Sequence, residues 1–556
     1  MIVSALVKRY EDTLDVPVGW QKREASYALD LSEDGKLLGI TQLGDHSGKK
    51  RGNLPLTLPS KGSGRSGKKA YETAFFLCDD GSYMLGLDPK KFESARKLHT
   101  SLLKNVSTPA ANAIKAYFSL SIPILPPGNE EKVDANAKYV FQVNGKRVDY
   151  DDGDAEIRNA WDTSRTSEGK QIRCLVSGKN DTVIRLHDKV ALRGVTMGAQ
   201  PLISMNDQTS FRSYGKKPGE PPADIGETTA FAYVTALNAL LKDKDHRQFI
   251  GSDTLVYWAE KGGEVEEELF ADMMDPPKGD EDKDLADTIA RITKGDKAVD
   301  YKRERKFYLL CLSPNAARIS VRFFYEGAFG DLIHNIGTHY DRLEIISDGR
   351  TPFRFLPLWL ILSETTVKKS TSDASPLLGG QLLYGILTGA VYPLTLYHAI
   401  LARIRAGEAI NQAKAAVVKA VLIRNFHERE VTTVALNEQS TNKPYVLGRL
   451  FSTLERLQEK ANGSSTIRSR YFTSACANPS SVFPTLLKLS VHHAAKLDNA
   501  VFFEKLKGGL LSHLDDETPF PAALNLDDQG RFILGYYHQT QSFFTKKDKG
   551  EASSDE

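Results

Sequence analysis

Apolar positions recur with one period in the first two thirds of this chain and with another in the last third. Before residue 365, predicted strands stand among helical segments: Ser26–Leu31, which alternates in part, Leu37–Leu43, the alternating segment 182–193, Asp253–Trp258 and the half-buried Ile319–Tyr325. The continuous apolar run Phe307–Leu312 predicts a buried strand. After residue 376 the amphipathic-helix period dominates: Glu408–Arg424, Val446–Lys460, Thr466–Cys476, Val482–Lys496 and Leu526–Phe544. In Val446–Lys460 one apolar stripe leaves Arg449, Arg456 and Lys460 on the solvated sides, and in Ile319–Tyr325 the face of Ile319, Val321 and Phe323 is the one expected toward the core. The pattern predicts an α+β fold, a large mixed N-terminal α/β region followed by an all-α C-terminal helical bundle.

The length of 556 residues is too great for one hydrophobic core. Shifts in composition predict a mixed β/α region at 1–125, a mixed α+β region at 126–365, a helical bundle at 376–545 and a disordered tail at 546–556. A Ser/Thr/Lys segment, Ser363–Ser375, is the predicted linker before the bundle.

The stretch Leu202–Leu241 combines polar, basic and aromatic side chains ahead of a Pro/Gly loop and a long helix with Thr228 as its expected N-cap. Amides and guanidinium groups read base edges, cations neutralise phosphates, and aromatic rings stack on bases. The ordinary alternative is a surface loop between strand and helix. The candidate DNA-binding residues here are Asn206, Gln208, Phe211, Arg212, Tyr214, Lys216 and Lys217.

A second candidate is the Gly-rich basic segment His46–Lys69, whose glycines allow close approach of the backbone to a phosphate or a groove. It nearly matches a phosphate loop at Gly62–Lys68, but a nucleotide site needs Ser or Thr next, where Lys69 stands, and a hydrophobic strand before it, where Pro55 and Pro59 stand. A nucleotide-binding enzyme using Gly62–Lys68 is therefore the alternative function. The candidate DNA-binding residues of this segment are Lys49, Lys50, Arg51, Lys61, Arg65, Lys68 and Lys69.

The uncharged run Ala374–Ala402 is long enough to span a bilayer. Because Pro393 and four glycines interrupt it, two buried core helices are the better prediction. The N-terminus meets charge too early for a signal peptide, and the four cysteines are isolated from one another, which predicts a cytoplasmic protein.

Catalytic motifs are missing from the sequence. His334 and His339 are five residues apart and therefore face different sides of a helix, so no metal site and no cofactor are predicted there. The net charge of only +2 means that any nucleic-acid role depends on local basic patches. We predict a protein that is not an enzyme.

Several blocks, in order along nearly the whole chain, resemble the type I-C (Dvulg subtype) CRISPR-associated large subunit of the Cascade surveillance complex. They are GWQKREASYALDLSEDGKLLGI, SFRSYGKKPGEPP, LSPNAARISVRFF, TIRSRYFTSACANPSSVFPTLLKL and FILGYYHQTQSFFTKK. The resemblance implies a non-catalytic subunit that recognises the protospacer-adjacent motif (PAM) on target double-stranded DNA, assists duplex unwinding and R-loop formation, and docks a helicase-nuclease.

The same resemblance implies the partners of the chain. They are guide crRNA, PAM-bearing target duplex with its displaced strand, the backbone and crRNA-processing subunits, small subunits and the recruited helicase-nuclease. It also implies that the C-terminal bundle is similar to a small subunit made from an internal start. Methionine occurs only at positions 1, 84, 197, 205, 273 and 274, so such a start within the bundle needs a near-cognate codon, for example at Val417, Val418 or Leu422.

Overall fold

A computed structural model describes residues 2–44, 53–61, 65, 70–166, 169–205, 215, 217, 219–276, 287–289, 291–292, 301–375 and 377–544. The chain forms two compact units, one of Met1–Lys242 with Asn315–Ser320 and one of Asp243–Pro314 with Val321–Glu556. The Thr196 amide donates to the Ala316 carbonyl at 3.1 Å within the first unit. This division lies at residue 242, whereas the boundaries predicted near residues 125 and 365–376 stay predictions.

The described strands of the N-terminal unit form three sheets. The largest runs in the order β3-β2-β6-β5, with β7 added to β6; β2 and β6 are parallel, and β3 and β5 are antiparallel to their neighbours. The other two sheets pair β1 with β4 and β8 with β9. The bounds are β1 Trp20–Ala25, β2 Tyr27–Leu31, β3 Leu37–Gln42, β4 Leu54–Pro59, β5 Cys78–Asp80, β6 Lys138–Val143, β7 Lys146–Arg147, β8 Gln171–Arg173 and β9 Asn180–Thr182.

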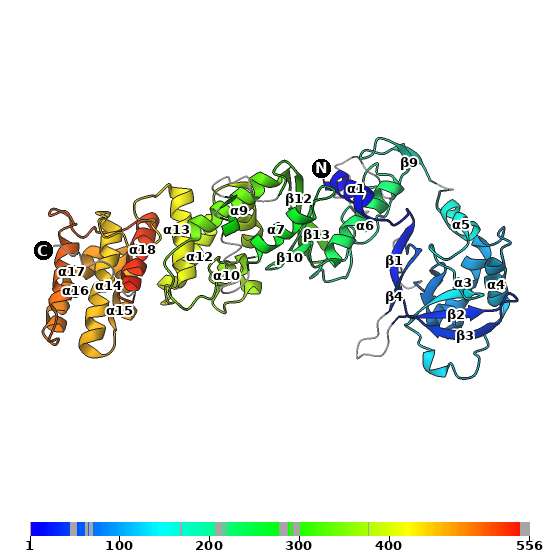
Figure 1. The fold of residues 1–556 in the computed structure, drawn as a ribbon, viewed down its shortest axis with the longest axis horizontal. Helices are drawn as coiled ribbons and strands as arrows, with labels where there is room; N and C mark the ends of the chain where they lie inside the picture. The colour runs from blue at the N-terminus through cyan, green and yellow to red at the C-terminus, as the bar shows by residue number, and fades with distance from the viewer. Residues whose placement is uncertain are drawn as a thin grey trace, which may run out of the picture. The chain divides into compact units, whose positions relative to one another are not determined.

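Helices of the N-terminal unit cover the large sheet and close its core. The Asp88 carboxylate caps α3 by accepting from the amides of Lys90 and Lys91, as expected for an N-cap followed by proline. Both α3 and α4 lie alongside the sheet in Figure 1, and the Tyr117 hydroxyl of α4 donates to the Met84 carbonyl at 2.6 Å inside this core. The helices are α1 Ile2–Thr13, α2 Gly81–Met84, α3 Pro89–Leu102, α4 Pro109–Ser119, α5 Ala155–Thr166 and α6 Glu227–Lys242.

The C-terminal unit begins with a four-stranded sheet, β10-β11-β12-β13, and continues as a series of helices. Every residue of β11 is buried, because the strand lies inside the sheet. The predicted α+β class is therefore confirmed. The bounds are β10 Arg247–Ile250, β11 Asp253–Ala259, α7 Glu264–Met274, β12 Lys306–Asn315, β13 Arg318–Ala328, α9 Phe329–Leu343, α10 Leu358–Ser363, α11 Leu378–Thr388, α12 Leu394–Arg405, α13 Gln412–Phe426, α14 Lys443–Asn462, α15 Ile467–Ala477, α16 Pro479–Ala494, α17 Val501–Leu511 and α18 Leu526–Ser542.

One hydrophobic core runs through this unit from Ile250 to Tyr537, so the sheet and the helical segments share buried surface. Where the uncharged run lies, α11 and α12 are separated at Pro393, as predicted. Within the described residues, no helix combines the length and the apolarity needed to cross a bilayer.

The helices α14 and α18 approach closely at two glycines. A Cβ atom on Gly448 would lie 2.0 Å from the Phe532 carbonyl oxygen, and one on Gly535 would lie 2.0 Å from that of Tyr445. The same interface carries buried polar contacts, among them Tyr445 Oη to His538 Nδ1 at 2.8 Å. Only glycine permits this separation of the two backbones.

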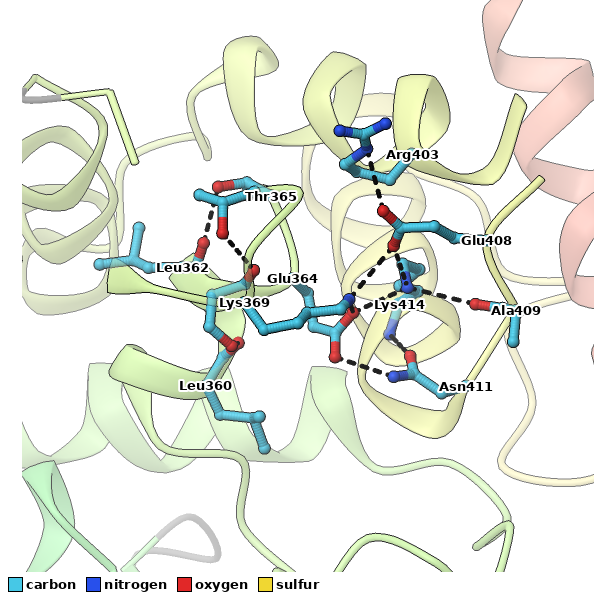
Figure 2. A network of polar contacts seen from close by, with 12 residues as sticks. Leu360, Leu362, Glu364, Thr365, Lys369, Arg403, Glu408, Ala409, Asn411 and Lys414 are labelled. Atoms are coloured by element: carbon cyan, nitrogen blue, oxygen red, sulfur yellow. Dashed lines mark hydrogen bonds and ion pairs between the residues drawn. The ribbon is translucent and has the colours of Figure 1, made fainter. Parts of the chain in front are cut away.

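The predicted linker is held by a network of charged side chains (Figure 2). Lys414 of α13 is 2% exposed, and its Nζ lies 2.8 Å from Glu364 and 3.1 Å from Glu408. Lys369 joins the same two carboxylates, and Asn411 donates to Glu364 at 2.8 Å. These contacts fix the segment between α10 and α11 against α13.

Three local predictions are wrong. Residues 182–193 form only isolated bridges, because β9 ends at Thr182 and no described strand pairs with the segment. Val321 of β13 is 42% exposed although its alternation predicts a core position. Arg449 of α14, predicted on a solvated face, is buried and bonds Gln539 and two main-chain carbonyls, because α14 is enclosed by other helices.

The start of α6 also differs from the prediction. Thr228 lies inside the helix, and its amide donates to Asp181 Oδ2 at 3.1 Å. The capping carboxylate thus comes from β9, a segment that is distant in the sequence.

Candidate nucleic-acid interface

The structure describes three of the candidate DNA-binding residues. These are Lys61, Arg65 and Lys217, and Lys217 is exposed beside Glu220, which accepts from its amide at 2.9 Å. The others lie outside the described residues: Lys49, Lys50, Arg51, Lys68, Lys69, Asn206, Gln208, Phe211, Arg212, Tyr214 and Lys216.

Arg65 is bound by the protein itself. Its guanidinium lies 4.0 Å from the ring centre of Phe75 and 3.8 Å from that of Tyr83, a cation–π arrangement on two rings. It forms an ion pair with Asp79, which is buried, and another with Asp80 at 3.2 Å. These contacts fix one point of the Gly-rich segment to β5 and α2.

Lys61 lines a cavity of about 300 Å³ in the N-terminal unit. We call this cavity the basic pocket. Four other cations line it, together with Glu24 and Pro55: Lys22, Arg23, Lys138 and Lys242. The cations come from β1, β6 and the last residue of α6, and the chain leaving β4 carries Lys61. Residues far apart in the sequence therefore concentrate positive charge at one point.

Four of these cations have partners within the unit. Lys22 donates to Thr57 Oγ1 at 2.7 Å, and Arg23 donates to the carbonyls of Pro59 at 3.2 Å and Cys78 at 3.0 Å. Lys138 pairs with Asp80, and Lys242 lies 4.0 Å from Glu24.

Lys61 differs from the other four. No hydrogen-bond acceptor or carboxylate among the described residues reaches its ammonium, which lies 5.2 Å from the Phe75 ring centre. The pocket thus contains a cation that lacks a partner anion in the described part of the chain.

The pocket is electrostatically suited to an anion. Burial first, and the charges of Arg23 and Lys138 second, lower the pKa of Lys61 to about 8. Burial likewise lowers the pKa of Lys138. A phosphate entering here would stabilise the charged form of both lysines, since an opposite charge at short range favours ionisation. The arrangement can therefore bind an anion and neutralise it.

Sequence reasoning found Lys61 and missed the other four cations of the pocket. One usable signal was the strand WQKREA, in which Lys22 and Arg23 stand between the buried Trp20 and Ala25. The contributions of Lys138 and Lys242 depend on tertiary packing and carry no local signal.

The predicted nucleotide site also needs one correction. The segment before Gly62 is a strand, β4, despite Pro55 and Pro59. Among the described strands, β4 pairs with β1 alone, and proline is tolerated in such an edge strand. A 3₁₀ turn at Ala70–Glu72 follows the Gly-rich segment.

The histidines considered as metal ligands lie on different sides of α9. His334 is exposed, whereas His339 is buried, with Nδ1 2.6 Å from the Tyr392 hydroxyl. Burial first, and the nearby arginines second, lower the pKa of His339 to about 3, so the ring is neutral. No group of three His, Cys, Asp or Glu side chains within the described ranges is arranged to hold a metal ion.

The fold and the pocket define an α+β protein with an anion-attracting surface in its N-terminal unit. A family model described as CRISPR-associated protein (Cas_Csd1) matches residues 6–544, so the chain is a CRISPR-associated protein of the Cascade type. It belongs to the Csd1 family, the type I-C large subunits, as the resemblance predicted. No curated protein matches the chain.

Proposed function

We propose that this chain recognises the PAM on target double-stranded DNA, assists unwinding of the duplex and formation of the R-loop, and docks the recruited helicase-nuclease. Guide RNA pairing reads the target sequence, so the protein needs only a short motif reader and positive tracks for the backbone. Its partners are the crRNA, both strands of the target, the backbone and crRNA-processing subunits, and the small subunits.

The observation that carries the proposal is the basic pocket, which Lys61 lines. Five cations converge there in a chain of net charge +2. Of the Gly-rich segment, Pro55 and Lys61 line the pocket, and Arg65 is bound by Asp79. The sequence neighbours Lys49, Lys50 and Arg51 lie outside the described residues. We assign phosphate contacts to this segment and base-edge contacts and strand separation to Asn206–Lys217.

Binding of the full chain to duplex DNA as a function of salt tests the phosphate contacts. Lys61→Gln and Lys242→Gln should each weaken binding to all sequences and reduce the salt slope by about one unit per lost contact. Lys36→Gln is the matched control, because Lys36 is exposed and pairs with Asp34 on the β2–β3 turn. An unchanged salt slope in both pocket variants would contradict the assignment.

The proposal includes no catalytic step for this subunit. Purified chain with magnesium should therefore leave DNA intact. Cleavage that is abolished by Asp331→Ala or His334→Ala would contradict this part of the proposal.

The alternative, a nucleotide-binding enzyme, has one structural feature in its favour, the strand β4 before Gly62. Position 69 is Lys, however, and offers no hydroxyl for magnesium. A binding measurement with ATP and magnesium separates the two functions: we expect no saturable binding.

A further inference from the structure

A second cavity of about 310 Å³ lies in the N-terminal unit, and Lys61 lines both it and the basic pocket. We call it the aromatic slot. Its walls come from the residues just before β5, from α3, α5 and α6, and from the chain after β9. The lining residues that matter for binding are Lys61, Phe75, Trp161, Arg165, Asp188 and Phe231. Nothing in the proposed function above uses it.

The walls of the slot are fixed in place. Trp161 stacks on Phe76 with ring centres 5.7 Å apart, and its Nε1 donates to the Gly19 carbonyl at 2.9 Å. His187 Nδ1 lies 2.8 Å from the Tyr233 hydroxyl. This contact fixes the backbone next to Asp188, the following residue. The slot is thus a formed cavity with rigid apolar sides.

Arg165 and Asp188, two of the charged groups of the slot, differ in their hydrogen-bond and ion-pair partners. Arg165 pairs with Glu227 through Nε at 3.1 Å and through Nη2, and its Nη1 lies 3.3 Å from Ser60 Oγ. Asp188, by contrast, has no hydrogen-bond donor or ion-pair partner among the described residues. Burial raises the pKa of Asp188, and the nearby charge of Arg165 only partly offsets this effect, while the Glu227 carboxylate adds to it.

These features select a flat, mostly apolar ligand that donates hydrogen bonds from one edge. A nucleobase has this character, and aromatic side chains are its usual contacts in single strands. Guanine presents two adjacent donors, N1–H and N2–H₂, to a carboxylate, and its O6 and N7 accept from a cation. Cytosine and adenine offer a carboxylate one exocyclic amino group each. Asp188 and Lys61 therefore match guanine best.

We propose that the aromatic slot binds an unpaired guanine base of DNA, with Asp188 on its donor edge and Lys61 toward its acceptor edge or its phosphate. This rests on the proposed function in one respect: the basic pocket would hold the backbone of the same strand, since Lys61 lines both cavities. The slot would then give the subunit a base preference outside the PAM duplex.

Binding of the full chain to short single-stranded DNA tests the proposal. The probes are a fluorescein-labelled thymine heptamer and the same heptamer with one central guanine, with free dGMP and the matching RNA heptamer as separate arms. The guanine heptamer should bind about tenfold more tightly than the all-thymine one, the effect of one good bidentate base contact. Asp188→Asn should make the two heptamers bind equally, because the variant loses the carboxylate that accepts from the guanine donor edge.

A second variant blocks the slot without altering the core. Leu186 lines the slot and is 56% exposed, so Leu186→Trp should fill the entrance and also remove the preference. Leu175→Trp and Asp224→Asn are the controls; Leu175 is 74% exposed, and neither residue lines the slot. Both controls should bind as the unaltered chain does.

The outcomes are distinct. Equal affinity for both heptamers in the unaltered chain, or a guanine preference that survives in both slot variants, overturns the slot. A preference confined to RNA overturns the assignment to DNA. Saturable dGMP binding that Asp188→Asn abolishes supports the slot even if duplex DNA does not bind. The failure of duplex DNA to bind would instead contradict the proposed function.

Discussion

Replacing Lys414 by methionine should destabilise the C-terminal unit more than any single surface change. The ammonium is almost completely buried and contacts Glu364, Glu408 and the Ala409 carbonyl at 2.8, 3.1 and 3.2 Å. Removing one partner of a buried ion pair costs about 3–5 kcal/mol, because the other charge stays buried without compensation. Since Glu364 keeps Lys369 and Asn411, we expect a loss of about 3 kcal/mol in the free energy of unfolding, or a fall in Tm of about 5 °C for a unit of this size.

The assay is chemical denaturation at pH 7 with a double-mutant cycle. Glu364→Gln combined with Lys414→Met should be more stable than the sum of the two single changes predicts, because the two residues contact each other. Lys306→Met is the control: its partner Glu326 lies 3.5 Å away on an exposed surface, where a pair contributes about 0–1 kcal/mol. A loss below about 1 kcal/mol for Lys414→Met, or strict additivity with Glu364→Gln, would refute the reasoning.

The pH dependence gives a second readout. Burial raises the pKa of Glu364, but hydrogen bonds from Lys369, Lys414 and Asn411 outweigh it, and the net pKa lies below the ordinary 4.5. A lowered folded-state pKa stabilises the protein above the unfolded pKa, and this stability is lost as the pH falls through the folded one. The difference in the free energy of unfolding between Lys414→Met and the unaltered chain should therefore become smaller below pH 4.5.

Three further predictions concern the interface and the bundle. Because the pKa of Lys61 is about 8 in the DNA-free chain, DNA affinity should fall about tenfold between pH 7 and pH 9, whereas Lys61→Arg, which stays charged, should lack this loss. Asn206→Ala or Gln208→Ala should relax PAM discrimination by about 1–3 kcal/mol in a selection from a randomised PAM library, while equal losses for all sequences would contradict a base-reading role. Expression of the native gene should yield a second product of about a quarter of the chain, starting between Glu408 and Val446; intact-mass analysis that detects only full-length chain would contradict this.

The strand and helix positions follow from the hydrophobic period wherever an element has one solvated face. The period predicted the bounds of α14 and α18 to within a few residues. It wrongly placed Arg449 on a solvated face, because other helices enclose α14 and bury its polar positions as well. It also placed Val321 in the core, since alternation shows that a strand has two faces but not which face is covered. The candidate interface was predictable only where basic residues cluster in sequence, as at Lys61. Lys138 and Lys242 join it through packing, which a single sequence does not reveal.

The discontinuity of the N-terminal unit has a consequence for its biosynthesis. Residues Asn315–Ser320 belong to this unit, although the rest of it ends at Lys242. Domains that emerge first usually fold first, at a synthesis rate of about 5–20 residues per second. Here the ribosome must add the segment from Asp243 to Ser320 before the Thr196–Ala316 bond can form, a delay of about 4–16 s. During this time the N-terminal unit lacks its last segment and its fold is incomplete. A pause in translation before Ser320 would lengthen this period.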